Sequence, residues 1–357
     1  MECHFVTGGA GFIGSCYVLK ARTNGIKVVN LDKLTYAGNL DNLKDLAEDP
    51  DYTFVHGGIE NEELVAWILK SYQPSVVINF AAESHVDRSI IDPESFVKTN
   101  VLGTATLLRV VKDWWKSLSP CEANKLRFLH VSTDEVFGTL GQNDLPFTET
   151  TPYSPNSPYS ASKAASDHLV RAFYETYGLP IFLTNCSNNY GPRQFPEKLI
   201  PLVILNALQE KTLPVYGTGS NIRDWLHVED HCEAISCVLN RGVLGSSYNI
   251  GGRAERTNLE IVQLICSILD EKCPRTSGSY SNLIRFVADR PGHDFRYAID
   301  CSKIEAELGW TPRFGLAAGL RSTINWYLEN NDWVQNIQTG AYKSWLQTNY
   351  GVRNKRV

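Results

Sequence analysis

The run Thr7-Gly8-Gly9-Ala10-Gly11-Phe12-Ile13-Gly14 carries the main signal for the architecture of this chain. Residues 3–7, which lead into it, are apolar and predict a buried β-strand. Residues 11–22, which follow, have apolar positions at helical spacing. A glycine-rich turn between a strand and a helix is typical of a βαβ unit that binds a dinucleotide, whereas the glycines alone would indicate only a tight turn.

Each glycine of this turn has its own expected role. Gly8 permits the tight turn, Gly11 lets the backbone approach a pyrophosphate at the helix N-terminus, and Gly14 permits close helix packing. Asp32 ends the second expected strand, where its carboxylate can accept hydrogen bonds from ribose hydroxyls and repel a 2′-phosphate. NAD is therefore favoured over NADP, although the neighbouring Lys33 would offset part of that repulsion.

Strand and helix signals alternate through the first half of the chain, as a parallel sheet requires. Strands are expected at residues 3–7, 27–31, 53–55, 76–80, 127–131 and 181–185, with crossover helices that include 11–22, 62–71 and 101–116. The fold class is therefore α/β, a Rossmann-type doubly wound parallel sheet with a smaller C-terminal substrate-binding lobe. The expected domains are 1–185 and 186–357, and a segment near 220–250 is a candidate to return to the first domain.

Composition narrows the range of partners. The 357 residues carry a net charge of −5 with both signs interspersed, so no basic surface is offered to nucleic acid or to a membrane. Apolar runs stay well below the roughly 18 residues that span a bilayer, and the N-terminus lacks a signal-peptide pattern, which favours the cytoplasm. Nine cysteines without a Cys-x-x-Cys pair predict reduced thiols and no metal.

A second signal joins Tyr159 and Lys163, which are four residues apart and share one face if the segment is helical. A tyrosine has a pKa near 10, and a neighbouring ammonium group lowers it because it favours the phenolate. Tyr159 is therefore expected to act as a base toward a hydroxyl. The alternative is an ordinary solvated helix face.

A third signal, Ser132-Thr133-Asp134-Glu135-Val136-Phe137-Gly138, directly follows the strand at 127–131. Ligands of open α/β sheets bind outside the carboxyl ends of the strands, where this run lies. Two adjacent carboxyl groups in a partly dry site repel each other as anions, so one can remain a protonated acid while the other serves as a base. An isolated Asp-Glu pair would more simply be a solvated turn.

Taken together, these motifs closely resemble the dTDP-glucose 4,6-dehydratases of the extended short-chain dehydrogenase/reductase family. The resemblance covers nearly the whole chain and is carried by residues 8–14, 31–39, 81–89, 133–135, 159–163, 185–192, 195–201, 222–225 and 289–294. The Thr-Asp-Glu run is its most specific element, because related epimerases and reductases lack the paired acids there.

The resemblance implies a reaction in which Tyr159, assisted by Lys163, removes the hydroxyl proton at sugar carbon 4 while NAD takes the hydride. Thr133 would hold the oxygen. Glu135 would then remove the proton from carbon 5, Asp134 would protonate the leaving hydroxyl at carbon 6, and the hydride would return to carbon 6. The implied conversion is dTDP-glucose to dTDP-4-keto-6-deoxyglucose plus water.

The same resemblance implies two sets of binding residues and a homodimer that pairs helices near 101–116 and 157–177. The NAD set is Gly8, Gly11, Phe12, Ile13, Gly14, Asp32, Lys33, Thr35, Ile59, Ala81, Ala82, Ser84, Thr99, Tyr159, Lys163 and Asn188. The nucleotide-sugar set is Ser84, Thr133, Asn188, Glu197, Lys198, Leu199, Pro214, Tyr216, Arg223, Asn258, Arg290, His293 and Tyr297. The chain departs from the family at Gly58, where relatives carry an Asp that can accept from the adenine amine.

Two other kinds of protein remain as alternatives. One is another enzyme of this fold, a nucleotide-sugar 4-epimerase or a UDP- or GDP-sugar dehydratase. Asp134 and Glu135 argue against an epimerase, which needs no acid and base at carbons 5 and 6. The other is a non-catalytic NAD sensor, which would have no use for Tyr159, Lys163 or the two carboxyl groups.

Overall fold

A seven-stranded parallel sheet forms the centre of the computed structural model, which describes residues 2–338. Its order is β10-β6-β5-β4-β1-β2-β3. The strands are β1 (Cys3–Thr7), β2 (Lys27–Asp32), β3 (Tyr52–His56), β4 (Val76–Asn79), β5 (Arg127–Thr133), β6 (Ile181–Cys186) and β10 (Ser247–Ile250). Six of them lie where the sequence pattern predicted them. The seventh, β10, pairs with β6 from beyond residue 186, and the domain boundary at residue 185 stays a prediction.

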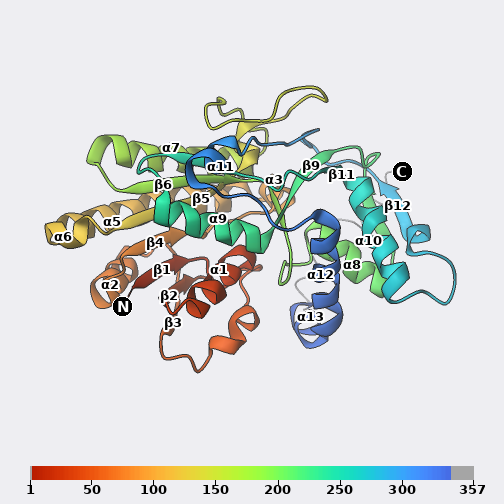
Figure 1. Ribbon diagram of the computed structural model, residues 1–357, viewed down its shortest axis with the longest axis horizontal. Coiled ribbons are helices and arrows are strands. Elements are labelled where there is room, and N and C mark those ends of the chain that lie inside the picture. The colour runs from red at the N-terminus through yellow and green to blue at the C-terminus, as the bar shows by residue number, and fades with distance from the viewer. Residues whose placement is uncertain (1, 339–357) are drawn as a thin grey trace.

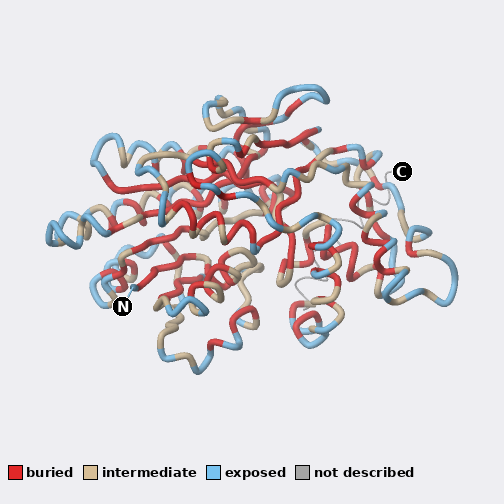
Figure 2. The backbone as a smooth tube through the Cα atoms, in the orientation of Figure 1, coloured by how far each residue is buried: buried red, intermediate tan, exposed pale blue. Residues whose placement is uncertain are grey.

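Helices cover both faces of this sheet (Figure 1). Alternate residues of a strand point to opposite faces, so Val6 packs with one helical layer and Phe5 with the other. The first layer contains α1 (Phe12–Thr23), α9 (Val228–Arg241) and α11 (Ser302–Leu308), and the second contains α2 (Glu62–Tyr72), α5 (Thr104–Ser117) and α7 (Pro158–Tyr177). Because both faces are covered, every strand except the edge strand β3 is buried along nearly its whole length (Figure 2).

A second hydrophobic core lies beside the sheet, on the right of Figure 1. It is built from α8 (Leu199–Leu208), α10 (Asn258–Lys272), α12 (Leu316–Glu329), α13 (Asn331–Ile337) and the parallel pair β8 (Leu213–Tyr216) and β12 (Ile284–Val287). A small sheet of β7 (Asn188–Tyr190), β9 (Ile222–His227) and β11 (Glu255–Thr257) joins the two cores. In β9, Trp225 packs into the second core and Leu226 into the first.

Short helices complete the described chain. They are η1 (Leu40–Leu46), α3 (Val86–Ile91), α4 (Pro93–Phe96), the π-helix η2 (Val97–Gly103), α6 (Pro120–Ala123), η3 (Asp134–Phe137) and η4 (Tyr280–Leu283). The helix expected at 101–116 is therefore observed as η2 followed by α5, one continuous helical segment that changes its hydrogen-bond pattern at Thr104.

The strand order creates a crevice where the connections diverge. β1 lies between β2 and β4, so the chain leaves it to one side and later returns on the other. In open α/β sheets, ligands bind outside the carboxyl ends of the strands at such a point. Gly8 after β1 and Ala81 after β4 lie so close together that a Cβ on Gly8 would be 2.7 Å from the Ala81 nitrogen. The crevice is therefore lined by backbone.

Candidate active site

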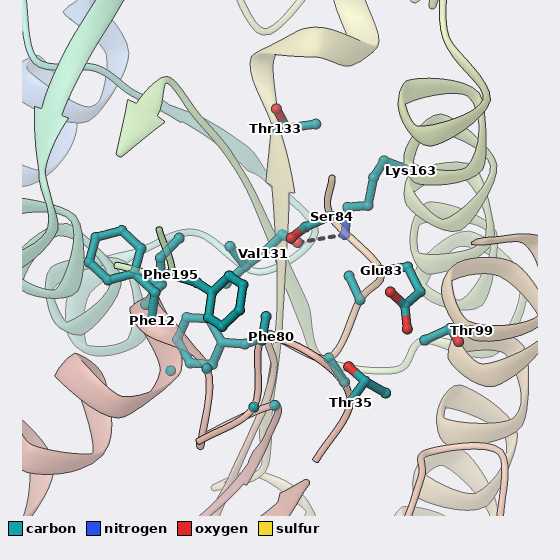
Figure 3. A pocket seen from close by; sticks show the side chains of 18 of the residues that line it. Phe12, Thr35, Phe80, Glu83, Ser84, Thr99, Val131, Thr133, Lys163 and Phe195 are labelled. Carbon is teal, nitrogen blue, oxygen red and sulfur yellow. Dashed lines mark hydrogen bonds between the residues drawn. The ribbon is translucent and has the colours of Figure 1, made fainter. Parts of the chain in front are cut away.

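One elongated cavity follows the carboxyl ends of β1, β2, β4 and β5 (Figure 3). Every residue predicted for the dinucleotide lines it, from the turn after β1 to Asn188 in β7. The five predicted catalytic residues line the same cavity: Thr133, Asp134, Glu135, Tyr159 and Lys163. Figure 3 shows Thr133 and Lys163 on the same side of the cavity as Ser84, and Phe12 and Phe195 on the other. Residues far apart in the sequence thus share one site.

The glycine turn has the form of an anion cradle. Gly8 has a φ of +71°, and a Cβ on Gly14 would lie 2.2 Å from the Gly8 carbonyl oxygen, so larger residues would collide with backbone. Helix α1 begins at Phe12 with Gly11 as its N-cap, without a side-chain cap and without an acidic residue in its first turn. Uncapped N–H groups and the helix dipole favour a negative ligand such as a pyrophosphate.

Asp32 is held rigidly at the end of β2. Its carboxylate accepts hydrogen bonds from the Leu34 nitrogen at 2.8 Å and the Ala10 nitrogen at 2.9 Å. Burial raises the pKa of Asp32, while these two backbone donors act in the opposite direction. The neighbouring Lys33 pairs with Glu60, with Nζ 2.5 Å from Oε1. The Glu60 carboxylate thus partly neutralises the charge of Lys33. Lys33 therefore offsets less of the repulsion between Asp32 and a 2′-phosphate.

Glu60 also occupies the space beside Gly58, the position at which the sequence is expected to depart from the family that it resembles. A Cβ on Gly58 would lie 2.1 Å from Glu60 Oε2. Both residues line the cavity together with Asp32. A carboxylate therefore lies near this wall of the cavity, although it comes from two residues later in the chain.

Tyr159 and Lys163 lie in the first two turns of α7, which brings them to the cavity side of β5. Ser157 caps this helix, and its hydroxyl accepts from the Ser160 nitrogen while the Ser160 hydroxyl accepts from the Ser157 nitrogen. Both functional side chains are buried. Lys163 Nζ donates to the Val131 carbonyl oxygen at 2.8 Å, the dashed line in Figure 3.

The expected lowering of the Tyr159 pKa is wrong for the chain by itself. Burial raises this pKa well above its ordinary value, the negative charge of Glu135 adds to the increase, and a hydrogen bond with Thr133 only partly opposes it. Desolvation of the phenolate is the largest of these influences. Tyr159 is therefore uncharged at neutral pH in the chain by itself.

Asp134 and Glu135 are adjacent in η3 but differ in their surroundings. Burial, followed by the charge of Glu135, raises the pKa of Asp134 well above its ordinary value, and within residues 2–338 its Oδ2 atom has no hydrogen-bond partner. Burial also raises the pKa of Glu135, but Arg290, Lys198 and Arg223 oppose that increase in this order. The surroundings favour a neutral Asp134 and a Glu135 that ionises more readily.

The residues predicted for the nucleotide-sugar divide into two groups. Ser84, Thr133, Asn188, Glu197 and Lys198 line the cavity, and the buried Asn188 Oδ1 lacks a partner among the described residues. Burial raises the pKa of Glu197 to about 7, against the charges of Lys198 and Arg88. The remaining residues, Leu199, Pro214, Tyr216, Arg223, Asn258, Arg290, His293 and Tyr297, do not line this cavity.

Three residues of this second group, Arg223, Arg290 and Tyr297, lie close enough to Glu135 to interact with it electrostatically. The Arg223 guanidinium lies 4.3 Å from the centre of the Tyr297 ring. Arg290 lies 3.7 Å from Asp87 Oδ1, and the Tyr216 hydroxyl donates to Asp87 Oδ2 at 3.1 Å.

Three residues of the second group lie in elements of the second hydrophobic core. Leu199 and Asn258 begin α8 and α10, and Pro214 lies in β8. Asn258 donates its backbone N–H to the Asn221 carbonyl at 2.9 Å. None of these three residues lines the cavity.

Several cavity residues were missed by the sequence reasoning. Glu83 and Phe195 belong to runs that carry the family resemblance, so those runs were the available signal. Cys186 lies in such a run and Gln194 lies just outside two of them, and neither side chain matched a chemical motif. Glu60 had no signal at all, because its approach to Gly58 depends on the fold. Across the described 2–338 segment, no cluster of His, Cys, Asp and Glu could hold a metal ion, and no helix is long and apolar enough to cross a membrane.

Fold and site together define an α/β enzyme in which a dinucleotide-type cleft meets a Tyr/Lys pair and an acidic pair. The family described as GDP-mannose 4,6 dehydratase matches residues 5–323. A dTDP-glucose 4,6-dehydratase of Xanthomonas campestris pv. campestris (strain B100) is 58% identical over 344 residues, 96% of this chain and 98% of that protein. The chain belongs to the dTDP-glucose 4,6-dehydratase family of the extended short-chain dehydrogenases/reductases.

Two solved structures are also similar. The dTDP-glucose 4,6-dehydratase from Bacillus anthracis str. Ames, in complex with NAD, has a TM-score of 0.84 and 46% identity, covering 95% of this chain and 100% of that one. The enzyme from Streptomyces venezuelae, with NAD and TYD bound, has a TM-score of 0.86 and 45% identity, covering 94% of this chain and 100% of that one.

Proposed function

We propose that this chain is a hydro-lyase that converts dTDP-glucose to dTDP-4-keto-6-deoxyglucose and water, with NAD as its retained cofactor. One observation carries the proposal. A single cavity contains a glycine cradle, a Tyr/Lys pair and two carboxyl groups with different surroundings. Relatives in the same family carry this activity in their names, and two of the solved structures contain NAD.

The cradle and Asp32 fit the dinucleotide. The uncapped start of α1 suits the pyrophosphate, and the fixed Asp32 carboxylate suits the adenosine ribose hydroxyls. Further residues of the predicted NAD set line the rest of the cavity. When bound, NAD accepts a hydride from carbon 4 of the sugar and later returns it to carbon 6.

Tyr159 and Thr133 act at carbon 4. Tyr159 takes the proton of the carbon 4 hydroxyl, and Thr133, which is hydrogen-bonded to Tyr159, steadies the same oxygen. Lys163 holds positive charge beside the phenol, which favours the phenolate form that must accept the proton. The resulting ketone acidifies the hydrogen at carbon 5.

Glu135 and Asp134 then remove water across carbons 5 and 6. Glu135 takes the carbon 5 proton as a base, and Asp134 gives its proton to the carbon 6 hydroxyl, which leaves as water. When carbon 6 receives the hydride, a proton returns to carbon 5 from Glu135. The stronger pKa elevation of Asp134 supports its role as the acid, and the three cations near Glu135 support its role as the base.

Substrate selection is part of the same proposal. Arg223 and Arg290 provide planar, permanently charged donors for a diphosphate, and Tyr216 provides a ring that can stack on thymine. The enzyme is proposed to work in the cytoplasm as a homodimer through helices near residues 101–116 and 157–177.

The purified protein should be incubated with dTDP-glucose in deuterated water without added cofactor, and the product examined by NMR and mass spectrometry. A 4-keto-6-deoxy product with deuterium at carbon 5 is expected. Unchanged dTDP-glucose, even with added NAD, would contradict the dehydratase proposal and favour the alternative of a nucleotide-sugar 4-epimerase.

A paired variant tests the base. Glu135→Gln should fold and retain NAD but lose exchange of the carbon 5 hydrogen with solvent, because the amide cannot accept that proton. Exchange at the wild-type rate would remove Glu135 from the mechanism.

A further inference from the structure

A buried polar cluster lies next to Lys163, outside the lining of the cavity. It contains His130 of β5 and Ser166 and Asp167 of α7, which are 1%, 0% and 0% exposed. None of the three lines the cavity. Asp167 follows Lys163 by four residues in α7, so both side chains project from the same face of the helix. Buried carboxylates are costly unless they are paired or hydrogen-bonded, so this one needs a physical reason.

His130 lies between the lysine and the carboxylate. Its Nε2 atom is 3.3 Å from Lys163 Nζ and 3.4 Å from Asp167 Oδ1. Its Nδ1 atom is 3.1 Å from the amide nitrogen of Asn79, which fixes the ring from the other side. Burial and the charge of Lys163 lower the pKa of His130 to about 4. The ring is therefore a neutral spacer at working pH and does not neutralise Asp167.

Asp167 is held in one orientation by donors from two other segments. Its Oδ2 atom accepts from the Ser132 hydroxyl at 2.6 Å and from the Tyr153 hydroxyl at 3.1 Å. Ser132 precedes the Thr133-Asp134-Glu135 run directly, so the carboxylate is also linked to β5, the strand that leads into the acidic pair of η3. Its Oδ1 atom faces His130 Nε2, and this interaction opposes the lowering of the His130 pKa. The Asp167 carboxylate therefore faces His130 Nε2, the same atom that lies next to Lys163 Nζ.

Lys163 needs a counter-charge because it is buried. Burial lowers its pKa, and the charge of Asp167 is the first influence that opposes this change, followed by Cys186 of β6. Burial raises the pKa of the Cys186 thiol, so Cys186 is uncharged near neutral pH. The other titratable groups around the lysine are Tyr159 on α7 and His130 on β5, both uncharged in the chain alone. Asp167 therefore supplies the compensating negative charge.

We propose that Asp167 is the counter-ion that keeps Lys163 charged, and that His130 positions the lysine ammonium beside Tyr159. Both are positioning residues, since neither lines the cavity. The inference rests on the proposed function, in which a charged Lys163 assists Tyr159. It adds a third, buried carboxyl group to the machinery: Asp134 and Glu135 exchange protons with the substrate, whereas Asp167 sets the charge of the lysine.

Asp167→Asn tests this proposal because it removes the charge and keeps an acceptor for Ser132 and Tyr153. At pH 7 and saturating dTDP-glucose, kcat should fall about tenfold or more, with little change in KM. Activity requires protonated Lys163, so it is lost as pH rises through the lysine pKa. Without Asp167 that pKa is lower, and the alkaline limb of the kcat profile should move to lower pH by about one pH unit or more.

Tyr153→Phe is the matched control, since it removes a donor to the same Asp167 oxygen but leaves the carboxylate charge. Its alkaline limb should stay at the wild-type pH. A second readout does not depend on turnover: the pH dependence of Lys163 acetylation, measured by mass spectrometry, should show a lower pKa in Asp167→Asn than in the wild type and Tyr153→Phe.

The outcomes separate this inference from the proposed function. Wild-type protein without dehydratase activity would reject the function. An active wild type whose alkaline limb and lysine acetylation are unchanged by Asp167→Asn, or shifted equally by Tyr153→Phe, would reject only the role of Asp167. If Asp167→Asn does not fold, Asp167→Ser removes the same charge with a smaller side chain and carries the same expectation.

Discussion

At the scale of single residues, chemically similar groups of the site differ in pKa because their surroundings differ. Asp134 and Glu135 are consecutive, and Arg223 opposes the pKa elevation of both, but Arg290 and Lys198 are the larger opposing charges at Glu135. Burial penalises the charged form of both carboxyl groups, and nearby cations offset that penalty. An acid and a base can therefore be neighbours without exchanging roles.

Replacing Arg290 should shift the acid limb of the pH profile. As a base, Glu135 works when ionised, so kcat falls as pH drops through its raised pKa. Arg290→Gln removes the largest charge that opposes that elevation and should move the acid limb to higher pH by roughly half to one pH unit. The measurement is kcat at saturating dTDP-glucose from about pH 5 to 9. Arg285→Gln, an exposed arginine of β12, is the control; an unmoved limb in Arg290→Gln would contradict the assigned influence.

Gly58 and Glu60 give a second test at this scale. Gly58→Asp should weaken NAD binding, because the new side chain would meet the Glu60 carboxylate beside the Gly58 Cα atom. Adding Glu60→Ala should restore binding, since it clears that space and leaves one carboxylate. Calorimetric titration of NAD into the cofactor-free variants measures both effects. Equal affinities of the single and double variants would show that the two side chains avoid each other.

At the scale of elements, helix α7 orients the catalytic pair through its beginning. Its capping box satisfies two backbone N–H groups at Ser157 and Ser160, and Tyr159 follows within the first turn. The capping box thus stabilises the helix and also fixes the position of Tyr159. The short helix α6 has the same kind of capping box at Ser119 and Glu122, and neither residue lines the cavity.

Ser157→Ala should cost about 1 kcal/mol of stability and also lower kcat, because the first turn carries Tyr159. Ser119→Ala removes a cap of the same kind and should leave kcat unchanged. Chemical denaturation and steady-state kinetics of the two variants make the comparison. If both variants kept wild-type kcat, the start of α7 would not control the position of Tyr159.

At the scale of the whole molecule, the last described helix is connected to the glycine turn. Trp333 of α13 donates its indole N–H to Asn42 Oδ1 at 2.8 Å, and Asn42 Nδ2 donates to the Ala10 carbonyl at 2.9 Å. All three residues are buried. A residue near 330 therefore contributes to the geometry of a turn near residue 10, and the second core supports the cofactor cleft of the first.

Trp333→Phe should destabilise the protein by about 1–3 kcal/mol, because it leaves the buried Asn42 oxygen without its donor. It should also weaken retention of NAD through the Ala10 turn. Trp310→Phe is the matched control, as Trp310 is buried but its indole nitrogen has no hydrogen-bond partner among residues 2–338. Thermal unfolding and the NAD content of purified protein are the measurements. Equal losses in both variants would attribute the effect to packing alone.

Local sequence patterns were sufficient for the six predicted strands and the glycine turn, whereas the helix that carries Tyr159 and Lys163 was implied by the family resemblance. These features depend on short-range rules: strand burial, helical spacing and backbone freedom at glycine. Family resemblance added the expected roles of Asp134 and Glu135. All the residues predicted for the dinucleotide meet in one cavity because the carboxyl ends of parallel strands lie at one edge of a sheet.

Only the folded chain sets the charges and long-range contacts. The pKa of Tyr159 is raised because the side chain is buried. That burial depends on tertiary packing, which no local sequence pattern contains. The same holds for Glu60 beside Gly58, for Asp167 behind Lys163, and for Trp333 against Asn42. Desolvation and electrostatic influence depend on distances in space, so residues far apart in sequence acquire their properties only when the tertiary structure brings them together.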